Sequence, residues 1–216
     1  MSQKFGTRRE QAKQETRRII FNTAYALFEQ KGYDGVTMRD LAAEAGVGLG
    51  TIFQHFKDKA NLLVSVFEEE FQPCVNQAFE SVPQASLKEQ LLFLVRQFFS
   101  YYAKRPHISR ILIKEIYIDP KNSGMIRSHL LNDIDRLTNL FADAQQRGEL
   151  SSDIAAGDAV ILWWSYYSFV LIQALQSDVF DVEEQMAIYA RLMEQHFRGI
   201  ESSSILHKFS CPDAQG

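Results

Sequence analysis

Apolar residues recur at helical spacing along almost the whole chain of 216 residues. The first such stretch runs from about residue 9 to Lys31, and Gly32 then ends the pattern. The spacing of that stretch places Ile20, Ala24, Leu27 and Phe28 on one face of the helix. The two-residue alternation of a half-buried strand is weak everywhere. The pattern therefore predicts an all-α protein.

Residues 37–59 have the pattern of two short helices joined by a tight turn at Gly46. Thr37 is suited to cap the first helix because its hydroxyl accepts an unpaired backbone N–H, and Asp40 stands three residues later, where a capping box places its acceptor. The second helix spans about residues 49–56. A helix–turn–helix with a glycine in the turn is the usual means of placing one small helix in a DNA major groove.

The remaining pattern predicts six further helices. Asp58 is suited to cap a helix that runs from Lys59 into the seventies, and Pro73 predicts a kink within it. Five more helices follow, separated by breaks near Val82, Pro106, Asp119, Gly148 and Asp181. We therefore expect a three-helix N-terminal unit, a six-helix C-terminal unit and a disordered tail, with ranges 1–58, 59–200 and 201–216.

Charge is distributed unevenly along the chain, whose formal net charge is −4. Residues 1–60 hold ten Lys or Arg against seven Asp or Glu, whereas the remainder holds thirteen against twenty. Six of the basic residues lie within the first 18 positions: Lys4, Arg8, Arg9, Lys13, Arg17 and Arg18. Alone, such a segment would be read as a solvated N-terminus. Beside a helix–turn–helix it favours contacts with DNA phosphates.

Other residue types narrow the class of protein. Cys74 and Cys211 are too few for a disulfide framework and fit a reducing compartment; Cys74 lies in an apolar helix pattern and is expected in the core. The N-terminus lacks the apolar stretch of a signal peptide. The histidines have no metal-ligand spacing, and there is no Gly-rich phosphate loop or nucleophile elbow. We expect a cytoplasmic protein that is not an enzyme and needs no cofactor.

Residues 159–177 form an uncharged stretch rich in Trp and Tyr. A membrane-spanning helix needs about 20 mainly apolar residues, but this stretch carries Ser165, Ser168 and Gln173 in its middle and has acidic flanks. We interpret it as a helix buried by protein, in part by a second subunit, and expect no membrane contact.

Residues 16–63 resemble the DNA-binding domain of the TetR-type bacterial transcriptional repressors. Three elements match in order and spacing: A-x-x-L-F-E-Q-K-G-Y at 24–33, V-T-M-R-D-L-A-A-E-A-G-V at 36–47 and G-T-I-F-Q-H-F-K-D-K-A-N-L-L at 50–63. The rest of the chain fits the family in its length and helical pattern. The resemblance implies an N-terminal DNA-binding domain, a C-terminal domain for ligand binding and dimerisation, and a four-helix dimer interface built from the last two helices.

The resemblance also implies which residues contact DNA. They are Thr37, Arg39, Gly48, Leu49, Thr51, Gln54, His55 and Lys59. Gln54 is suited to adenine and Thr51 to a phosphate or a thymine methyl, while Thr37 and Lys59 match positions that contact phosphate. Two residues depart from the family pattern: Gly48 replaces a frequent Ser or Thr, and Phe53 replaces a frequent Tyr, so the phosphate contact of that hydroxyl is not expected here.

A ligand cavity is implied in the C-terminal domain, and its aromatic residues suit an apolar or planar effector. The candidate lining residues are Phe98, Tyr102, Leu112, Glu115, Trp163, Tyr166 and Tyr167. A helical aromatic stripe is equally typical of a core or a dimer interface.

These observations predict a ligand-responsive transcriptional regulator of bacterial type, a repressor that binds a double-stranded, pseudo-palindromic operator as a homodimer. A hydrophobic or aromatic small-molecule effector would release it from DNA. Two alternatives remain open: a DNA-bound adaptor whose C-terminal domain binds a protein partner, and a helical enzyme or carrier with a vestigial helix–turn–helix.

Overall fold

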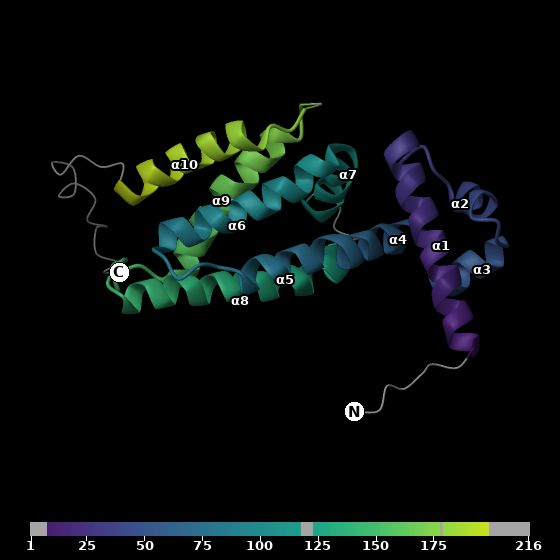
Figure 1. Ribbon diagram of the computed structural model, residues 1–216, viewed down its shortest axis with the longest axis horizontal. Coiled ribbons are helices and arrows are strands. Elements are labelled where there is room, and N and C mark those ends of the chain that lie inside the picture. Colours follow the sequence, from purple (N-terminus) through teal and green to yellow (C-terminus); the bar gives the residue numbers. More distant parts are fainter. Residues whose placement is uncertain (1–7, 118–122, 178, 199–216) are drawn as a thin grey trace, which may run out of the picture.

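The computed structural model describes residues 8–117, 123–177 and 179–198. Within these ranges the chain folds into helices joined by short turns, which confirms the predicted all-α class (Figure 1). The expected disordered tail at 201–216 lies outside the described residues. The helices are α1 (Arg8–Lys31), α2 (Met38–Glu44), α3 (Leu49–His55), α4 (Lys59–Val66), η1 (Phe67–Phe71), α5 (Gln72–Glu80), α6 (Leu87–Lys104), α7 (Pro106–Tyr117), α8 (Ser123–Gln146), α9 (Ala156–Ala174) and α10 (Val182–Arg198).

Helices α1, α2 and α3 pack around a small core of their own at one end of the molecule (Figure 1). Phe28, Leu41, Ile52 and Phe56 are fully buried there. The two turns require glycine because Gly32, after α1, and Gly46, between α2 and α3, have φ values of +73° and +66°. The predicted helix end and helix–turn–helix turn are thus confirmed.

A continuous rod of α4, η1 and α5 runs from this unit along the underside of α6 (Figure 1). Asp58 caps its start, accepting the Asn61 N–H at 2.7 Å. We expected a kink at Pro73; the structure has a π-helical turn, η1, just before it, where the wider spacing accommodates a residue without a backbone N–H. Counted as one helix, the rod brings the described elements to the predicted three plus six.

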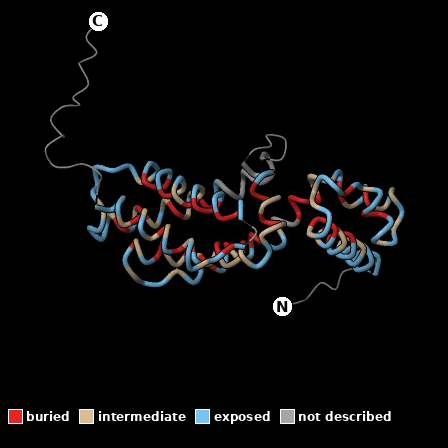
Figure 2. Tube along the Cα trace, turned by 90° about the horizontal axis from the view of Figure 1, so that it is seen from above, coloured by how far each residue is buried: buried red, intermediate tan, exposed pale blue. Residues whose placement is uncertain are grey.

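The C-terminal helices surround α6, which lies at the centre of the bundle. Helix α10 packs on α6 and α9, α8 packs on α9, and α5 packs on α6. Ion pairs of Lys88 with Glu194 and of Arg96 with Glu183 join α6 to α10. Figure 2 shows the buried positions along the inner sides of both helical units and through the segment that joins them. Cys74, predicted to be core, is only half-buried because it lies toward the side of α5.

No helix in the described part of the chain is long and apolar enough to cross a membrane. The Trp/Tyr-rich helix α9 turns one side into the core, where Trp163, Tyr167 and Val170 are buried. Its other side is exposed in the single chain, with Ile161 at 64% and Phe169 at 58%. The sequence therefore combines two apolar faces on one helix.

Candidate nucleic-acid interface and interior site

The helix–turn–helix begins at a complete capping box. The Thr37 hydroxyl oxygen accepts the Asp40 N–H at 3.2 Å, and the Asp40 carboxylate accepts the Thr37 N–H at 2.8 Å. The Thr37 hydroxyl also donates to the same carboxylate at 2.6 Å. These hydrogen bonds from Thr37 lower the pKa of Asp40, so the box is ionised at neutral pH. The arrangement fixes the start of α2 and confirms the predicted cap.

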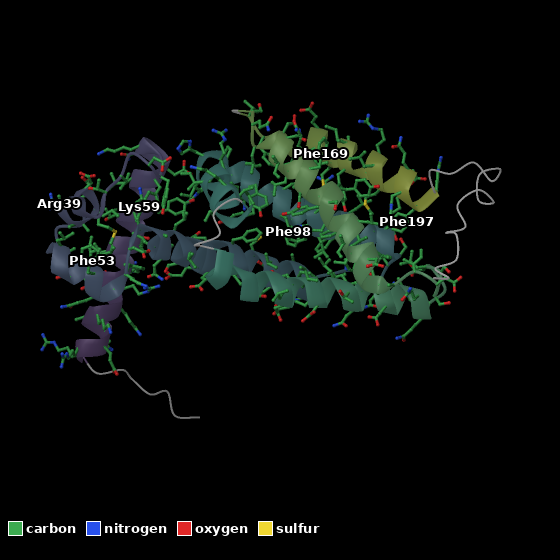
Figure 3. The ribbon with its side chains drawn as sticks, turned by 180° about the vertical axis from the view of Figure 1, so that it is seen from behind. Arg39, Phe53, Lys59, Phe98, Phe169 and Phe197 are labelled. Atoms are coloured by element: carbon green, nitrogen blue, oxygen red, sulfur yellow. The ribbon has the colours of Figure 1, made fainter. Side chains whose placement is uncertain are left out.

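Helix α3 has one buried side and one open side. Ile52 is fully buried against the three-helix core, whereas Phe53 is 50% exposed and Gln54 is exposed beside it. Leu49, Thr51 and His55 are half-buried, and Gly48, the N-cap residue, is exposed. Figure 3 shows Phe53 and the exposed Arg39 at the end of the molecule remote from the C-terminal helices. The predicted DNA-facing residues of α2 and α3 are therefore accessible together.

Phe53 was left out of the predicted contact set because it lacks a hydroxyl. Its exposure shows that the side chain nevertheless belongs to this surface. An apolar side chain on such a surface is suited to a thymine methyl group. The available signal was helical position, since Phe53 lies on the side of α3 away from Ile52.

Lys59 has a structural task that sequence reasoning missed. Its ammonium group donates to the carbonyl oxygens of Tyr33 at 2.7 Å and Val36 at 3.0 Å, and lies 4.1 Å from the Tyr33 ring centroid. It thereby ties the start of α4 to the segment that precedes Thr37. The phosphate contact of Lys59 stays a prediction, and the third N–H of the ammonium group is the donor left for it.

His55 stands at the end of α3 in a basic environment. Burial lowers its pKa, and the positive charges of Lys13 and Arg17 lower it further. Arg17 is held over the Phe56 ring, with its guanidinium carbon 4.4 Å from the ring centroid, and pairs with Glu69 of η1 at 2.9 Å. The neutral imidazole is thus the favoured form at pH 7 in the free protein.

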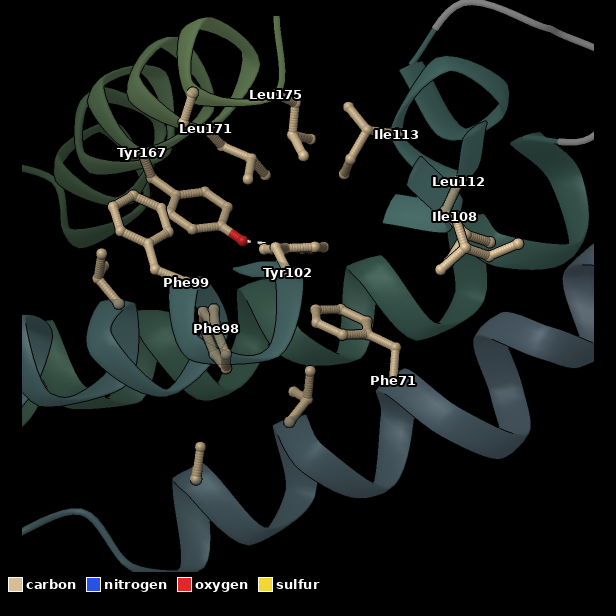
Figure 4. Packing of buried hydrophobic residues seen from close by; sticks show 14 of the residues in the cluster. Phe71, Phe98, Phe99, Tyr102, Ile108, Leu112, Ile113, Tyr167, Leu171 and Leu175 are labelled. Carbon is tan, nitrogen blue, oxygen red and sulfur yellow. Dashed lines mark hydrogen bonds between the residues drawn. The ribbon is translucent and has the colours of Figure 1, made fainter. Parts of the chain in front are cut away.

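Five of the seven predicted ligand-lining residues meet inside the C-terminal unit: Phe98, Tyr102, Leu112, Trp163 and Tyr167 are all buried. The Tyr167 hydroxyl donates to the Tyr102 hydroxyl at 3.4 Å. The Trp163 and Tyr167 rings stack with 5.5 Å between centroids. Figure 4 shows side chains from η1, α6, α7 and α9 converging around Tyr102. We call these five residues the aromatic cluster.

Of the two other predicted residues, Tyr166 does not join the aromatic cluster. Tyr166 is half-buried and points toward α10, where its ring lies 5.5 Å from that of His196. The side chain of Glu115 lies outside the described part of the structure. Conversely, the structure adds Phe71, whose ring lies 5.2 Å from that of Tyr102, and Tyr189, whose ring lies 6.3 Å from that of Phe99.

Two polar atoms near the aromatic cluster are buried without a hydrogen bond: the Trp163 indole nitrogen and the Tyr189 hydroxyl. Burial also raises the pKa of Tyr189 well above its usual value. Leaving such a group unpaired costs about 1–3 kcal/mol, and native interiors seldom do so. These atoms therefore mark positions at which a polar group of a bound molecule would be stabilised.

The described ranges contain no group of three or more His, Cys, Asp or Glu side chains placed to hold a metal ion.

Residues 20–66 match the model for the family described as bacterial regulatory proteins, tetR family. The helix–turn–helix segment is therefore of the TetR family. The match covers α2, α3 and most of the core that supports them, the same segment in which the capping box and the exposed side of α3 lie.

Among relatives of this chain, a probable HTH-type transcriptional regulator of Bacillus subtilis, YttP, is 34% identical over 110 residues, which cover 50% of this chain and 53% of YttP. The HTH-type regulator SAUSA300_2515 of Staphylococcus aureus is 39% identical over 56 residues, covering 26% of this chain and 30% of that protein. The matches thus span about half or less of the length of these relatives.

Solved structures with a similar fold match most of the length of the chain. FadR of Bacillus subtilis in complex with stearoyl-CoA has a TM-score of 0.70 at 20% identity and covers 82% of this chain and 96% of FadR. FadR of Thermus thermophilus in complex with lauroyl-CoA has a TM-score of 0.64 at 18% identity, covering 87% and 98%. A regulator of Saccharomonospora viridis in complex with choline has a TM-score of 0.65 at 19% identity, covering 84% and 96%.

Proposed function

We propose that this protein is a ligand-responsive transcriptional repressor that binds a pseudo-palindromic DNA operator as a homodimer. The observation that carries the proposal is the exposed side of α3, which follows the capped helix α2 and lies with it in the segment that matches the TetR family. Helix α3 would enter a major groove, and the start of α2 would lie on the adjacent backbone.

Each exposed residue has a role that its chemistry suits. Gln54 would read adenine through its amide, and Thr51 and Phe53 would meet a thymine methyl or the backbone. Arg39, together with Thr37 at the α2 N-terminus, would contact phosphates. Gly48 and Leu49 would allow the start of α3 to approach the DNA closely. His55 would contact a phosphate when its imidazole is protonated. Lys59 would mainly order the segment before Thr37.

Homodimerisation is supported by the outer face of α9. Ile161, Leu162, Phe169 and Ile172 form an exposed apolar strip along this helix, and such strips typically mark interfaces. Two copies joined through this strip and α10 would be related by two-fold symmetry. The two α3 helices would then address half-sites about one helical turn of DNA apart.

The effector would be a mainly hydrophobic or aromatic molecule that enters the C-terminal unit at the aromatic cluster. The buried, unpaired Trp163 nitrogen and Tyr189 hydroxyl support this site because a ligand with a polar group would satisfy them. The FadR structures contain acyl-CoA and another similar fold contains choline, so the fold alone does not choose the ligand class. Acyl-CoA thioesters are the first compounds to test.

The test has two stages. Selection from randomised duplex DNA, followed by fluorescence anisotropy, should yield a palindromic site bound by the wild-type protein. Lauroyl-CoA, with free CoA as the control, should then be titrated into the complex and monitored for release of DNA. Failure to select any sequence would overturn the regulator assignment, whereas selection without release by apolar compounds would favour an adaptor that binds a protein partner.

A further inference from the structure

A cleft of about 370 Å³ lies between the N-terminal three-helix unit and α7, and its lining includes no residue of α3 or of the aromatic cluster. One wall is the turn at residues 31–35, which follows α1. The other wall is one side of α7, formed by His107, Arg110, Ile111 and Lys114 at helical spacing. Its size falls at the lower end of the range of about 300–1,000 Å³ for small-molecule sites.

The turn forms a wall with few side chains. A Cβ atom at Gly35 would lie 2.4 Å from the Lys31 carbonyl oxygen, so only glycine fits there. Gly32, with φ +73°, also favours glycine, and a Cβ atom there would face His107 Nε2 at 3.9 Å. Gly32 and Gly35 therefore place no side chain in the cleft opposite α7, which leaves room for a small molecule.

The charge of the cleft is positive, although the chain as a whole is negative. Lys31, Arg110 and Lys114 line it, against Asp34 as the acidic residue. Lys114 lies 3.5 Å from the Asp34 carboxylate, but that side chain is 85% exposed, so water screens the pair. Arg110 is held rigidly, because its guanidinium donates to the carbonyl oxygens of Leu175 at 2.6 Å and Ser177 at 3.0 Å.

The cleft also offers an apolar surface and an unsatisfied nitrogen. Tyr33 and Ile111 are half-buried in its walls. The Nε2 atom of His107 is buried beside Gly32 and makes no hydrogen bond. A basic rim above apolar walls suits a compact organic anion: its carboxylate or phosphoryl group would meet the cations while its body packs on Tyr33 and Ile111.

We propose that this cleft is a second ligand site, which binds a small organic anion with an apolar body and sets how the N-terminal unit sits against α7. Two contacts already cross the junction beside it. Glu29 of α1 accepts the Ile108 N–H of α7 at 3.1 Å, and the Arg105 guanidinium carbon lies 4.4 Å from the Tyr25 ring centroid. An anion between Lys31 and Lys114 would add a third tie between the same elements and favour this orientation over others.

The binding test uses benzoate and phenyl phosphate as probes, with benzyl alcohol as the uncharged control, titrated into the full chain by calorimetry. We expect saturable binding of at least one anion and at least tenfold weaker binding of benzyl alcohol. The double variant K31Q/K114Q should weaken anion binding at least tenfold. K104Q removes an exposed lysine of α6 outside the cleft and should bind as the wild type does.

Several results would overturn the site. They are no saturable binding of either anion up to about 10 mM, equal loss in K104Q, or no loss in K31Q/K114Q. The regulatory part rests on the proposed function and has its own readout: a bound anion should change operator affinity at least fivefold in the wild type and not in K31Q/K114Q. Binding without that change would refute the regulatory role and retain the site, and neither result depends on the effector at the aromatic cluster.

Discussion

Helices α3 and α9 each expose large apolar side chains in the single chain, but the two exposed surfaces differ in chemistry. The α3 side presents Gln54 and one aromatic ring, Phe53, next to the exposed Arg39 of α2, over a small buried core. The α9 side presents a strip of large apolar residues over a core filled with aromatic rings. A surface for a hydrated polyanion keeps its polar groups accessible, whereas a surface for a second protein chain gains most from apolar area.

This difference predicts that the two surfaces fail differently when mutated. A change on α3 should alter DNA binding and leave assembly intact. A change on α9 should remove assembly and, with it, the advantage of binding two half-sites at once.

The largest effect is expected from Phe169→Asp. The charge would face the apolar strip of the partner copy, so the dimer should dissociate while each chain stays folded. Operator affinity should fall about 100-fold or more, because linked binding at two half-sites is lost. Analytical ultracentrifugation and anisotropy would measure the two effects. The neighbouring Val170→Asp is the matched comparison: Val170 is 1% exposed, so this charge should unfold the chain instead. A dimeric Phe169→Asp protein would show that the strip is not the interface.

Gln54→Ala should produce an effect of intermediate size. Loss of one amide contact to a base should cost about 1–3 kcal/mol at one position of each half-site and relax the sequence preference there. Selection from randomised DNA would reveal the change, and Gln77→Ala, an exposed position of α5, serves as the control. An unchanged selection profile would mean that another side of α3 reads the bases.

Arg39→Ala should affect DNA binding alone, whereas Lys59→Ala should affect both DNA binding and thermal stability. Arg39→Ala should weaken binding about equally on all sequences and reduce the salt slope of log K by about one unit, with no change in stability. Lys59→Ala should also lower the unfolding temperature, because it leaves the Tyr33 and Val36 carbonyl groups without their donor. Salt titrations and thermal melts of both variants would distinguish them. Equal thermal stability of the two would contradict the structural role of Lys59.

The smallest effect concerns pH and His55. In the free protein its pKa is lowered, whereas a nearby phosphate would raise it, so DNA binding would take up a proton. Operator affinity should therefore rise as pH falls through the bound-state pKa and level off below the free-state pKa. His55→Asn should remove this dependence in anisotropy titrations between about pH 5 and 8. A pH profile that persists in the variant would assign the proton to another group.

Features that depend on neighbouring residues could be predicted from the sequence, whereas contacts between residues far apart in the chain could not. Thr37, Asp40 and Gly46 act on their neighbours in the chain, so the cap, the turn and the two short helices could be predicted from residue type and spacing alone. Lys59 donates to carbonyl groups 23 and 26 residues earlier in the chain, and no local sequence pattern predicts these two hydrogen bonds.

For α9, the sequence does not determine which side of the helix faces the core. Tyr166 and Tyr167 are adjacent in sequence, yet one faces α10 and the other the aromatic cluster. Phe169 and Val170 differ in the same way, one exposed and one buried. Where both sides of a helix are apolar, hydrophobic periodicity loses the contrast that would set the helix phase. The cleft beside α7 was also unpredictable, since it exists only once residues 31–35 meet a helix far along the chain.

The π turn at η1 has a mechanical consequence for the rod between the two units. An α-helix advances about 100° per residue, and a π turn holds one residue more than the α-helical turn it replaces. The π turn therefore changes the direction in which the side chains that follow it point. Glu69 is directed to Arg17 of the N-terminal unit, while Phe71 is directed to Tyr102 in the bundle. Deleting one residue from Phe67–Phe71 would restore an unbroken α-helix and turn α5 by about 100° relative to α4. Both units would keep their own folds, but they would be joined in the wrong rotational register.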